Sequence, residues 1–393
     1  MMNYAYSRRM EGEQDNAIRE ILALTSRPEV ISFAGGMPSA DAFPLDFIKE
    51  ATNYYLENEP ISVLQYGSSQ GFGPLLRNLV TFFANKGLKT DVENFVVTTG
   101  SQEGIELVCK AFLNPSDVVL VESPTYLVAL KTFKSFEAKC ESVETDHEGV
   151  IPEDLEEKIK KFNPKLIYLI PNFQNPTGTT LNEERRKKCY EIAVKYNVII
   201  LEDDPYGELR YSGQAVPSIK SMDETGNVIY LQSFSKIVSP GLRVGAIVAN
   251  KDIIRKIDSA KQSMDVHTAS LNQAIVSRFI ETGEVYTHVE KIRDLYRKKI
   301  NTMTDCLGNY LPDGAYFSKP DGGMFIWCEL DGKINSIPLL KEAAMLNVAF
   351  IPGMPFYAEG GHANTLRLNF TSSSLEQIEK GIKVLGDLIK TKY

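Results

Sequence analysis

Residues 233–245 read SFSKIVSPGLRVG, and no other stretch of the chain says more about its fold and chemistry. Lys236 follows two hydroxyl side chains, Ser233 and Ser235, and Arg243 comes after it beside a Pro-Gly turn. An amine can form a Schiff base with an aldehyde, while hydroxyls and a guanidinium fork can bind phosphate oxygens. The stretch therefore predicts covalent binding of a phosphorylated aldehyde such as pyridoxal 5'-phosphate at Lys236. A lysine picked at random is usually just solvated, but these flanking residues argue against that interpretation.

Around this stretch, from residue 95 to 249, short β-rich runs alternate with helix-length amphipathic runs. Such alternation is typical of βαβ crossovers and predicts an α/β fold, with a mostly parallel central sheet and helices on both faces. The expected strands are 95–99, 118–121, 166–170, 198–202, 228–231 and 243–248, and the expected helices are 102–112, 183–195 and 251–264.

The character of the sequence changes after residue 269. Long helical patterns at 271–281 and 284–310 lead into a mixed tail. The tail contains expected strands at 324–329, 348–351 and 366–370 and a final helix from residue 375. We place a large cofactor-binding domain at 45–285 and a smaller α/β domain at 1–44 together with 286–393.

Composition and charge narrow the class of protein. The 393 residues are 43% hydrophobic and 24% charged, with a formal net charge of −8. This length predicts two domains, and the acidic balance disfavours nucleic acid as a partner. The five cysteines are scattered without a CxxC pair, as in proteins of a reducing compartment. The four histidines show no metal-ligand spacing. Neither a signal peptide nor a bilayer-length apolar run is found, so we expect a cytoplasmic protein without a metal or a membrane span.

A candidate anion site follows the expected strand at 95–99. Gly100, Ser101 and Gln102 precede an amphipathic helix, where exposed backbone N–H groups can bind a phosphate. The same residues often form an ordinary helix N-cap. A second loop, at 171–178, reads PNFQNPTG and contains Asn175, which can donate a hydrogen bond to the phenolic oxygen of a pyridoxal ring. The alternative for this loop is a plain Asn-Pro turn.

The next expected strand ends in the sequence EDDPY, residues 202–206. A carboxylate at this position can pair with the pyridine nitrogen and keep it protonated, and we assign this role to Asp203. Tyr206 is expected to contact the ring phenolate and to lower the pKa of the Schiff base. A metal site or a solvated loop is the alternative. The motifs fall at successive strand ends, where open α/β sheets bind ligands.

With these motifs in view, the chain resembles the class I aminotransferases of pyridoxal-phosphate fold type I. The resemblance is strongest to the branch that contains α-aminoadipate, kynurenine and aromatic aminotransferases. It covers nearly the whole length and is carried by residues 31–38, 64–67, 99–102, 171–178, 202–206, 233–245, 322–325 and 365–368.

The resemblance implies further roles. Tyr126 should stack on the cofactor ring, and Tyr66 should reach the phosphate of the neighbouring subunit's cofactor, which makes the enzyme a homodimer. Arg367 should bind the substrate α-carboxylate, with Gly36 and Asn175 also in the substrate site. Arg19 resembles an arginine that contacts a second substrate carboxylate, although Arg8 and Arg9 are nearby rivals.

The implied reaction is the transfer of an amino group from an L-amino acid to a 2-oxo acid by a ping-pong mechanism, with Lys236 as tether and general base. The amino donor is 2-aminoadipate, an aromatic or a branched-chain amino acid, and the acceptor is expected to be 2-oxoglutarate. A β-eliminating C–S lyase or a cyclopropane-forming synthase uses similar machinery and is the enzymatic alternative. A non-catalytic effector-binding domain of a transcription regulator is less favoured, since about thirty residues precede Ile31.

Overall fold

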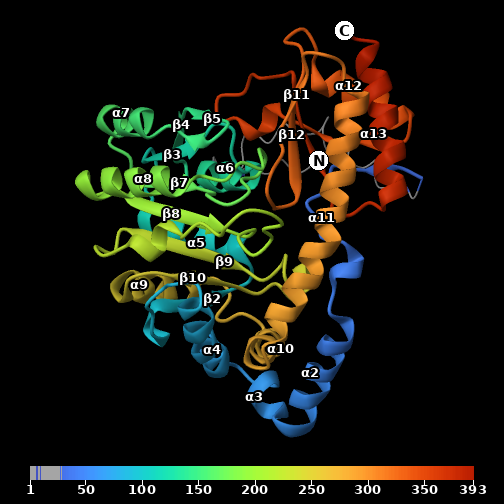
Figure 1. Ribbon diagram of the computed structural model, residues 1–393. Coiled ribbons are helices and arrows are strands. Elements are labelled where there is room, and N and C mark those ends of the chain that lie inside the picture. Colours follow the sequence, from blue (N-terminus) through green and yellow to red (C-terminus); the bar gives the residue numbers. More distant parts are fainter. Residues whose placement is uncertain (1–5, 8, 10–26, 28) are drawn as a thin grey trace, which may run out of the picture.

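The computed structural model describes residues 6–7, 9, 27 and 29–393, and its largest element is a seven-stranded sheet (Figure 1). In spatial order its strands are β2 (Phe95–Thr98), β10 (Gly245–Val248), β9 (Val228–Ser233), β8 (Ile199–Asp204), β7 (Leu166–Leu169), β3 (Val118–Glu122) and β4 (Lys139–Val143). β10 runs antiparallel to both of its neighbours, whereas the pairs from β9 to β4 are parallel. The prediction of a mostly parallel sheet is confirmed.

The sheet is covered on both faces because its strands are apolar on both sides. In β8, Leu201 belongs to the core cluster that includes helix α5 (Ser101–Phe112), whereas its neighbour Ile200 belongs to the cluster with α7 (Pro152–Phe162) and α8 (Glu183–Lys195). Successive side chains of a strand point to opposite faces, so this alternation places α5 on one face and α7 and α8 on the other.

Of the remaining helices, three precede the large sheet in the chain, one lies between β3 and β4, and the others follow β10. In chain order, the remaining helices are α2 (Leu45–Asn58), α3 (Pro60–Leu64), α4 (Gly73–Ala84), α6 (Leu127–Ser135), α9 (Lys251–Gln262), α10 (Ser270–Glu281), α11 (Glu284–Tyr310), α12 (Ser336–Met345) and α13 (Leu375–Lys390). The long helix α11 runs from α10, beside the large sheet, to α13 (Figure 1). None of the helices in the described part of the chain is both long and apolar enough to cross a bilayer.

A second, antiparallel sheet of four strands lies beside the upper half of α11 (Figure 1). Its order is β11 (Tyr316–Phe317), β12 (Phe325–Glu329), β15 (Thr365–Asn369) and β14 (Ile351–Pro352). The N-terminal strand β1 (Ile31–Ser32) pairs in parallel with β13 (Val348–Ala349), so the N-terminal segment packs with the tail. The division of the chain at residues 45 and 285 stays a prediction.

The expected single strand at 348–351 is wrong. β13 pairs with β1, whereas β14 pairs with β15 in the four-stranded sheet. Phe350, which is fully buried, lies between them. The apolar run therefore passes from one sheet to another, because each half finds a different partner strand.

Candidate active site

A cavity of about 320 Å³ lies at the carboxyl ends of β7, β8 and β9. It is lined by Gly36, Ser101, Gln102, Tyr126, Leu127, Val128, Ile170, Asn175, Asp203, Pro205, Tyr206, Ser233, Ser235, Lys236, Pro240, Arg243, Phe325 and Arg367. Of the predicted site residues that the structure describes, only Gly100 and Tyr66 are not in the lining. A larger and more open cavity of about 800 Å³ contains Asp204 and Arg293 but none of the predicted residues.

Lys236 follows the end of β9 and is half-buried in the cavity. Its Nζ atom donates a hydrogen bond of 2.8 Å to the carbonyl oxygen of Gly36. Burial, followed by the positive charges of Arg367 and Arg243, lowers the pKa of Lys236 to about 8. The uncharged form, which a nucleophile toward an aldehyde must have, is therefore far more populated near neutral pH than for an ordinary lysine.

Asp203 faces the cavity because of the alternation of β8. Leu201 and Asp203 share one face of the strand, whereas Glu202 and Asp204 point to the other. The hydroxyl of Tyr168 on β7 donates a hydrogen bond of 2.7 Å to Asp203 Oδ2. Burial raises the pKa of Asp203 to about 7, and the hydrogen bond from Tyr168 opposes this rise. A buried carboxylate is usually paired with a positive charge, and Asp203 has no such partner among the described residues.

The predicted phosphate site is a turn between β2 and α5. Gly100 precedes the helix with a φ of 79°, a left-handed conformation that favours glycine. A side chain at Gly100 would collide with the guanidinium of Arg243, whose Nη2 donates a 3.0 Å hydrogen bond to the carbonyl oxygen of Thr99. Arg243 also has a positive φ, 52°, and the following strand begins only at Gly245. The expected start of this strand at residue 243 is therefore wrong, and the turn aims the arginine at the start of α5.

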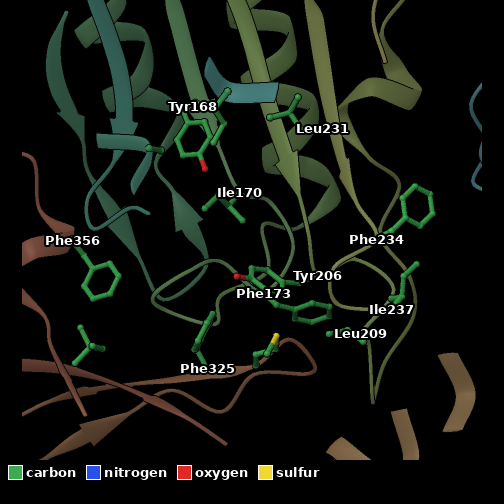
Figure 2. Close-up of a cluster of buried hydrophobic side chains, with 14 of the residues drawn as sticks. Tyr168, Ile170, Phe173, Tyr206, Leu209, Leu231, Phe234, Ile237, Phe325 and Phe356 are labelled. Carbon is green, nitrogen blue, oxygen red and sulfur yellow. The ribbon is translucent and has the colours of Figure 1, made fainter. Parts of the chain in front are cut away.

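Arg367 on β15 and Asn175 on the loop after β7 lie together at the other side of the cavity. Arg367 Nη1 donates to Asn175 Oδ1 and Nη2 donates to the carbonyl oxygen of Ala34, each at 2.8 Å. The guanidinium lies 4.1 Å from the ring centre of Phe325, which also packs edge-on against Tyr206 (Figure 2). Because Asn175 Oδ1 accepts from Arg367, Asn175 can donate only through its Nδ2 group, which interacts with the hydroxyl of Tyr206.

The loop that carries Asn175 is bonded to Arg186 of α8, whose side chain is fully buried. Its Nη2 atom donates to the carbonyl oxygen of Pro171 at 2.9 Å and to Asn172 Oδ1 at 2.7 Å. Its Nε atom donates to the carbonyl oxygen of Leu181, where the loop ends, at 2.8 Å. One buried guanidinium therefore joins the start of the loop, at residues 171 and 172, to its end at Leu181.

Several buried polar atoms of the cavity lack a partner within the described residues. They include Asp203 Oδ1, Ser235 Oγ and Arg367 Nε. Buried polar atoms almost always form hydrogen bonds, so such a group of exceptions indicates a ligand. A carboxylate oxygen suits a protonated ring nitrogen, a hydroxyl suits a phosphate and a guanidinium suits a carboxylate. The residues present therefore fit pyridoxal phosphate together with an amino acid.

Comparison with known proteins agrees with this geometry. The family described as "Aminotransferase class I and II" matches residues 28–385. The chain belongs to this family. Its fold is that of the pyridoxal-phosphate enzymes of fold type I, and the prediction of a pyridoxal-phosphate-dependent aminotransferase is confirmed.

Members of the aminotransferase family resemble the chain over nearly its full length. The aromatic-amino-acid aminotransferase 1 of Thermococcus litoralis is 41% identical over 391 residues, which are 98% of this chain and 94% of that protein. Kynurenine aminotransferase from Pyrococcus horikoshii, crystallised with PMP, has a TM-score of 0.95 at 40% identity, covering 98% and 97% of the chains. LysN, the α-aminoadipate aminotransferase of Thermus thermophilus, complexed with N-(5'-phosphopyridoxyl)-L-leucine, has a TM-score of 0.91 at 35% identity, covering 98% and 97%. These relatives do not favour the lyase, synthase or regulator alternatives.

Tyr66 does not line the cavity of the single chain. Tyr66 is 84% exposed, and its ring lies edge-on to His267 with 5.9 Å between ring centres. Arg19, which we expected to contact a second substrate carboxylate, lies outside the described residues, as does its rival Arg8.

Tyr168 is a residue that the sequence analysis missed. It is fully buried on β7 and bonds the carboxylate of Asp203 on the neighbouring strand. It is the one hydroxyl in the apolar run LIYLI at 166–170, and that is the signal by which it could have been found.

Proposed function

We propose that the protein transfers the amino group of an aromatic, 2-aminoadipate or branched-chain L-amino acid to a 2-oxo acid, with 2-oxoglutarate as the expected acceptor. The observation that carries this proposal is the meeting, in one cavity, of Lys236, an unpartnered oxygen of Asp203 and an unpartnered Nε of Arg367. The donor classes follow those named for the similar enzymes.

The cavity offers a place for each part of pyridoxal phosphate. When bound, this cofactor supplies an aldehyde that captures amino groups and a ring that withdraws electrons from the reacting carbon. Lys236 would hold it covalently, and Asp203 would keep its ring nitrogen protonated. Asn175 and Tyr206 would contact its phenolic oxygen, and Tyr126 would pack on its ring. Its phosphate would be held by Gly100, Ser101, Gln102, Ser233, Ser235 and Arg243.

The remaining groups act on the substrate. The guanidinium of Arg367 would bind the α-carboxylate, and this contact fixes the direction of the bond between Cα and its hydrogen. The neutral amine of Lys236 then takes that proton, which its lowered pKa allows near neutral pH. The backbone at Gly36, whose carbonyl oxygen holds Nζ, lies beside the same reacting groups.

We further propose that the active form is a homodimer in the cytoplasm, in which Tyr66 reaches the phosphate site of the partner subunit. Tyr66 is 84% exposed, and Ile61 and Leu64 just before it are 78% and 67% exposed. Exposed apolar side chains in such a row are typical of a surface that another chain covers. Arg243, at the phosphate site, is also exposed in the single chain. The free cysteines fit a reducing compartment.

A half-reaction screen tests this function. The protein is loaded with pyridoxal phosphate and mixed with one amino acid at a time, without a 2-oxo acid, while the cofactor absorbance and released ammonia are followed. A transaminase stops after one turnover per site and resumes when 2-oxoglutarate is added. Continuous release of ammonia would instead establish a lyase and overturn the proposal.

Lys236→Ala and Lys220→Ala provide the matched pair for the screen. Lys220 forms an ion pair with Asp223 at 2.7 Å outside the cavity. We expect Lys236→Ala to lose transfer by a factor of about 10⁴ or more, as for loss of a residue that is both tether and base, and Lys220→Ala to retain it. Borohydride reduction of the loaded wild type should label the peptide that contains Lys236 and no other.

A further inference from the structure

A buried cluster of charges that takes no part in the mechanism above lies behind the predicted phosphate turn. The side chain of Lys261, near the end of α9, has no exposed surface, and its Nζ atom lies 2.9 and 3.0 Å from the two carboxylate oxygens of Glu103 on α5. The same Nζ lies 2.9 Å from both oxygens of Asp265. The side chain of Glu103 is 6% exposed and that of Asp265 is 30% exposed. One ammonium thus serves two carboxylates.

The cluster is bonded directly to the backbone of the turn. Glu103 Oε2 accepts a short hydrogen bond from the backbone N–H of Thr99, the residue before Gly100. The hydroxyl of Thr99 donates to Asp265 Oδ2 at 3.2 Å, and its carbonyl oxygen accepts from Arg243 at 3.0 Å. All three polar groups of Thr99 are therefore engaged, two of them by the cluster. Because the peptide between Thr99 and Gly100 is planar, holding the carbonyl group of Thr99 also holds the N–H of Gly100, which donates to the carbonyl oxygen of Thr98 at 2.8 Å.

An adjoining strained turn indicates that the segment is firmly held. Val266 follows Asp265 and has a φ of 70°, which is rare for a β-branched residue. The backbone N–H of His267 donates to the carbonyl oxygen of Asp265 at 2.8 Å across it. Such strain persists only where surrounding contacts compensate for it, and the bonds from Asp265 to Lys261 and Thr99 are such contacts.

Charge gives Lys261 a second role. Without it, Glu103 and Asp265 would place two uncompensated carboxylates next to a site for a phosphate dianion, and like charges repel strongly where water is excluded. With it, one of these negative charges is cancelled. An ion pair that merely joined α5 to α9 would not need the bonds to Thr99.

We propose that Glu103, Lys261 and Asp265 position the turn at 99–102 for the cofactor phosphate, and that Lys261 is the residue on which this arrangement depends. The proposal rests on the proposed function, because it requires the phosphate of pyridoxal phosphate to bind at this turn. None of the three residues needs to touch the cofactor, so they are positioning residues.

The decisive measurement compares pyridoxal phosphate with pyridoxal, which lacks the phosphate. Both are titrated into the cofactor-free wild type and Lys261→Met, and binding is followed by absorbance. We expect the dissociation constant of pyridoxal phosphate to rise about tenfold or more, the effect of misplacing charge-assisted hydrogen bonds, while that of pyridoxal changes by less than about threefold. Inorganic phosphate should compete less well in the variant.

Glu103→Met and Glu103→Gln form a matched pair that tests the proposal independently if Lys261→Met does not fold. The two variants have side chains of similar size and the same charge, and each leaves Lys261 paired with Asp265. Only glutamine offers an oxygen to the N–H of Thr99. We expect Glu103→Met to weaken the binding of pyridoxal phosphate about tenfold relative to Glu103→Gln, with pyridoxal unaffected.

Lys220→Met is the control for loss of a buried ion pair. Lys220 is 12% exposed in its side chain, pairs with Asp223 and donates to the carbonyl oxygen of Val228 at the start of β9, away from Ser233 at its end. Lys220→Met should lower the melting temperature of the protein and leave the dissociation constants of pyridoxal phosphate and pyridoxal unchanged. Equal loss of both ligands in Lys261→Met, or equal affinities in the Glu103 pair, would overturn the proposal. Absence of any labelling of Lys236 in the wild type would instead refute the proposed function.

Discussion

Lys236 occupies a cavity that disfavours its own positive charge, and its reactivity should reflect this. Because its pKa is lowered to about 8, the reactive neutral amine forms as the pH rises through that value. We expect the rate of covalent capture of pyridoxal phosphate by the cofactor-free protein to rise with a midpoint near pH 8. Arg367→Gln removes a nearby positive charge and should move the midpoint upward. Stopped-flow absorbance from pH 6.5 to 10 measures both, and a midpoint near that of free lysine, about 10.4, would contradict the prediction.

Asp203 should destabilise the protein in the absence of cofactor. Its pKa rises from 3.8 in the unfolded chain to about 7 in the folded one. The carboxyl is protonated in both states well below pH 3.8, so the penalty is absent there, grows as the pH rises through 3.8 and is complete above about pH 7. Asp203→Asn should therefore raise the free energy of unfolding of the cofactor-free protein at pH 8, on the order of 2–4 kcal/mol, although it abolishes activity.

Urea unfolding at pH 8 and pH 4 checks this sign. The advantage of Asp203→Asn should be much smaller at pH 4, because that pH is close to the pKa of 3.8 in the unfolded chain. Tyr168→Phe, which removes the hydrogen bond to the carboxylate, should make the cofactor-free protein less stable at pH 8. A variant Asp203→Asn that is no more stable than wild type at pH 8 would show that this carboxylate is better solvated than its burial indicates.

The contact between β10 and the start of α5 builds the phosphate turn. A Cβ atom on Gly245 would lie 2.8 Å from the carbonyl carbon of Gly100 and 2.9 Å from the backbone nitrogen of Ser101. Backbone atoms cannot move aside as side chains do. We expect Gly245→Ala to lower the free energy of unfolding by roughly 1–3 kcal/mol and to weaken the binding of pyridoxal phosphate.

Gly308→Ala on α11 is the control for that substitution. No atom lies within 4 Å of a Cβ at this position, so alanine should stabilise the helix by about 0.5–1 kcal/mol. Denaturant unfolding and cofactor titration of both variants give the comparison. Wild-type cofactor affinity in Gly245→Ala would mean that the turn tolerates displacement.

At the level of the whole molecule, the exposed apolar residues of α3 should decide assembly. We expect the double variant Ile61→Asp and Leu64→Asp to be monomeric at concentrations where the wild type is dimeric, because it places charges within the proposed interface. Sedimentation velocity measures the oligomeric state. The affinity of the double variant for the cofactor should also fall, since Tyr66 would no longer reach the phosphate site of the partner subunit. Met345→Asp on α12, where the side chain is 76% exposed, should change neither quantity. A wild type that sediments as a monomer would refute the dimer.

Local sequence was enough to find most strands of the large sheet and most of the cavity lining, but it missed β4 and the helices α6 and α7. Helices α8 and α11 have the predicted bounds, because charged outer positions and apolar spacing mark both ends clearly. Lys236, Asp203 and Asn175 follow strand ends marked by turn residues. In an open parallel sheet the carboxyl ends of strands share one edge, so neighbouring motifs necessarily approach one another.

Contacts between distant segments required the folded chain. Tyr168 meets Asp203 only through the register of β7 against β8, and Arg367 meets Asn175 only because the tail's sheet packs against the loop after β7. The bond from Lys261 to Glu103 spans 158 positions of the sequence. Composition and periodicity specify which face of an element is buried, because burial follows apolar pattern. They do not specify which polar side chains meet inside, because that depends on packing and register between elements far apart in the chain.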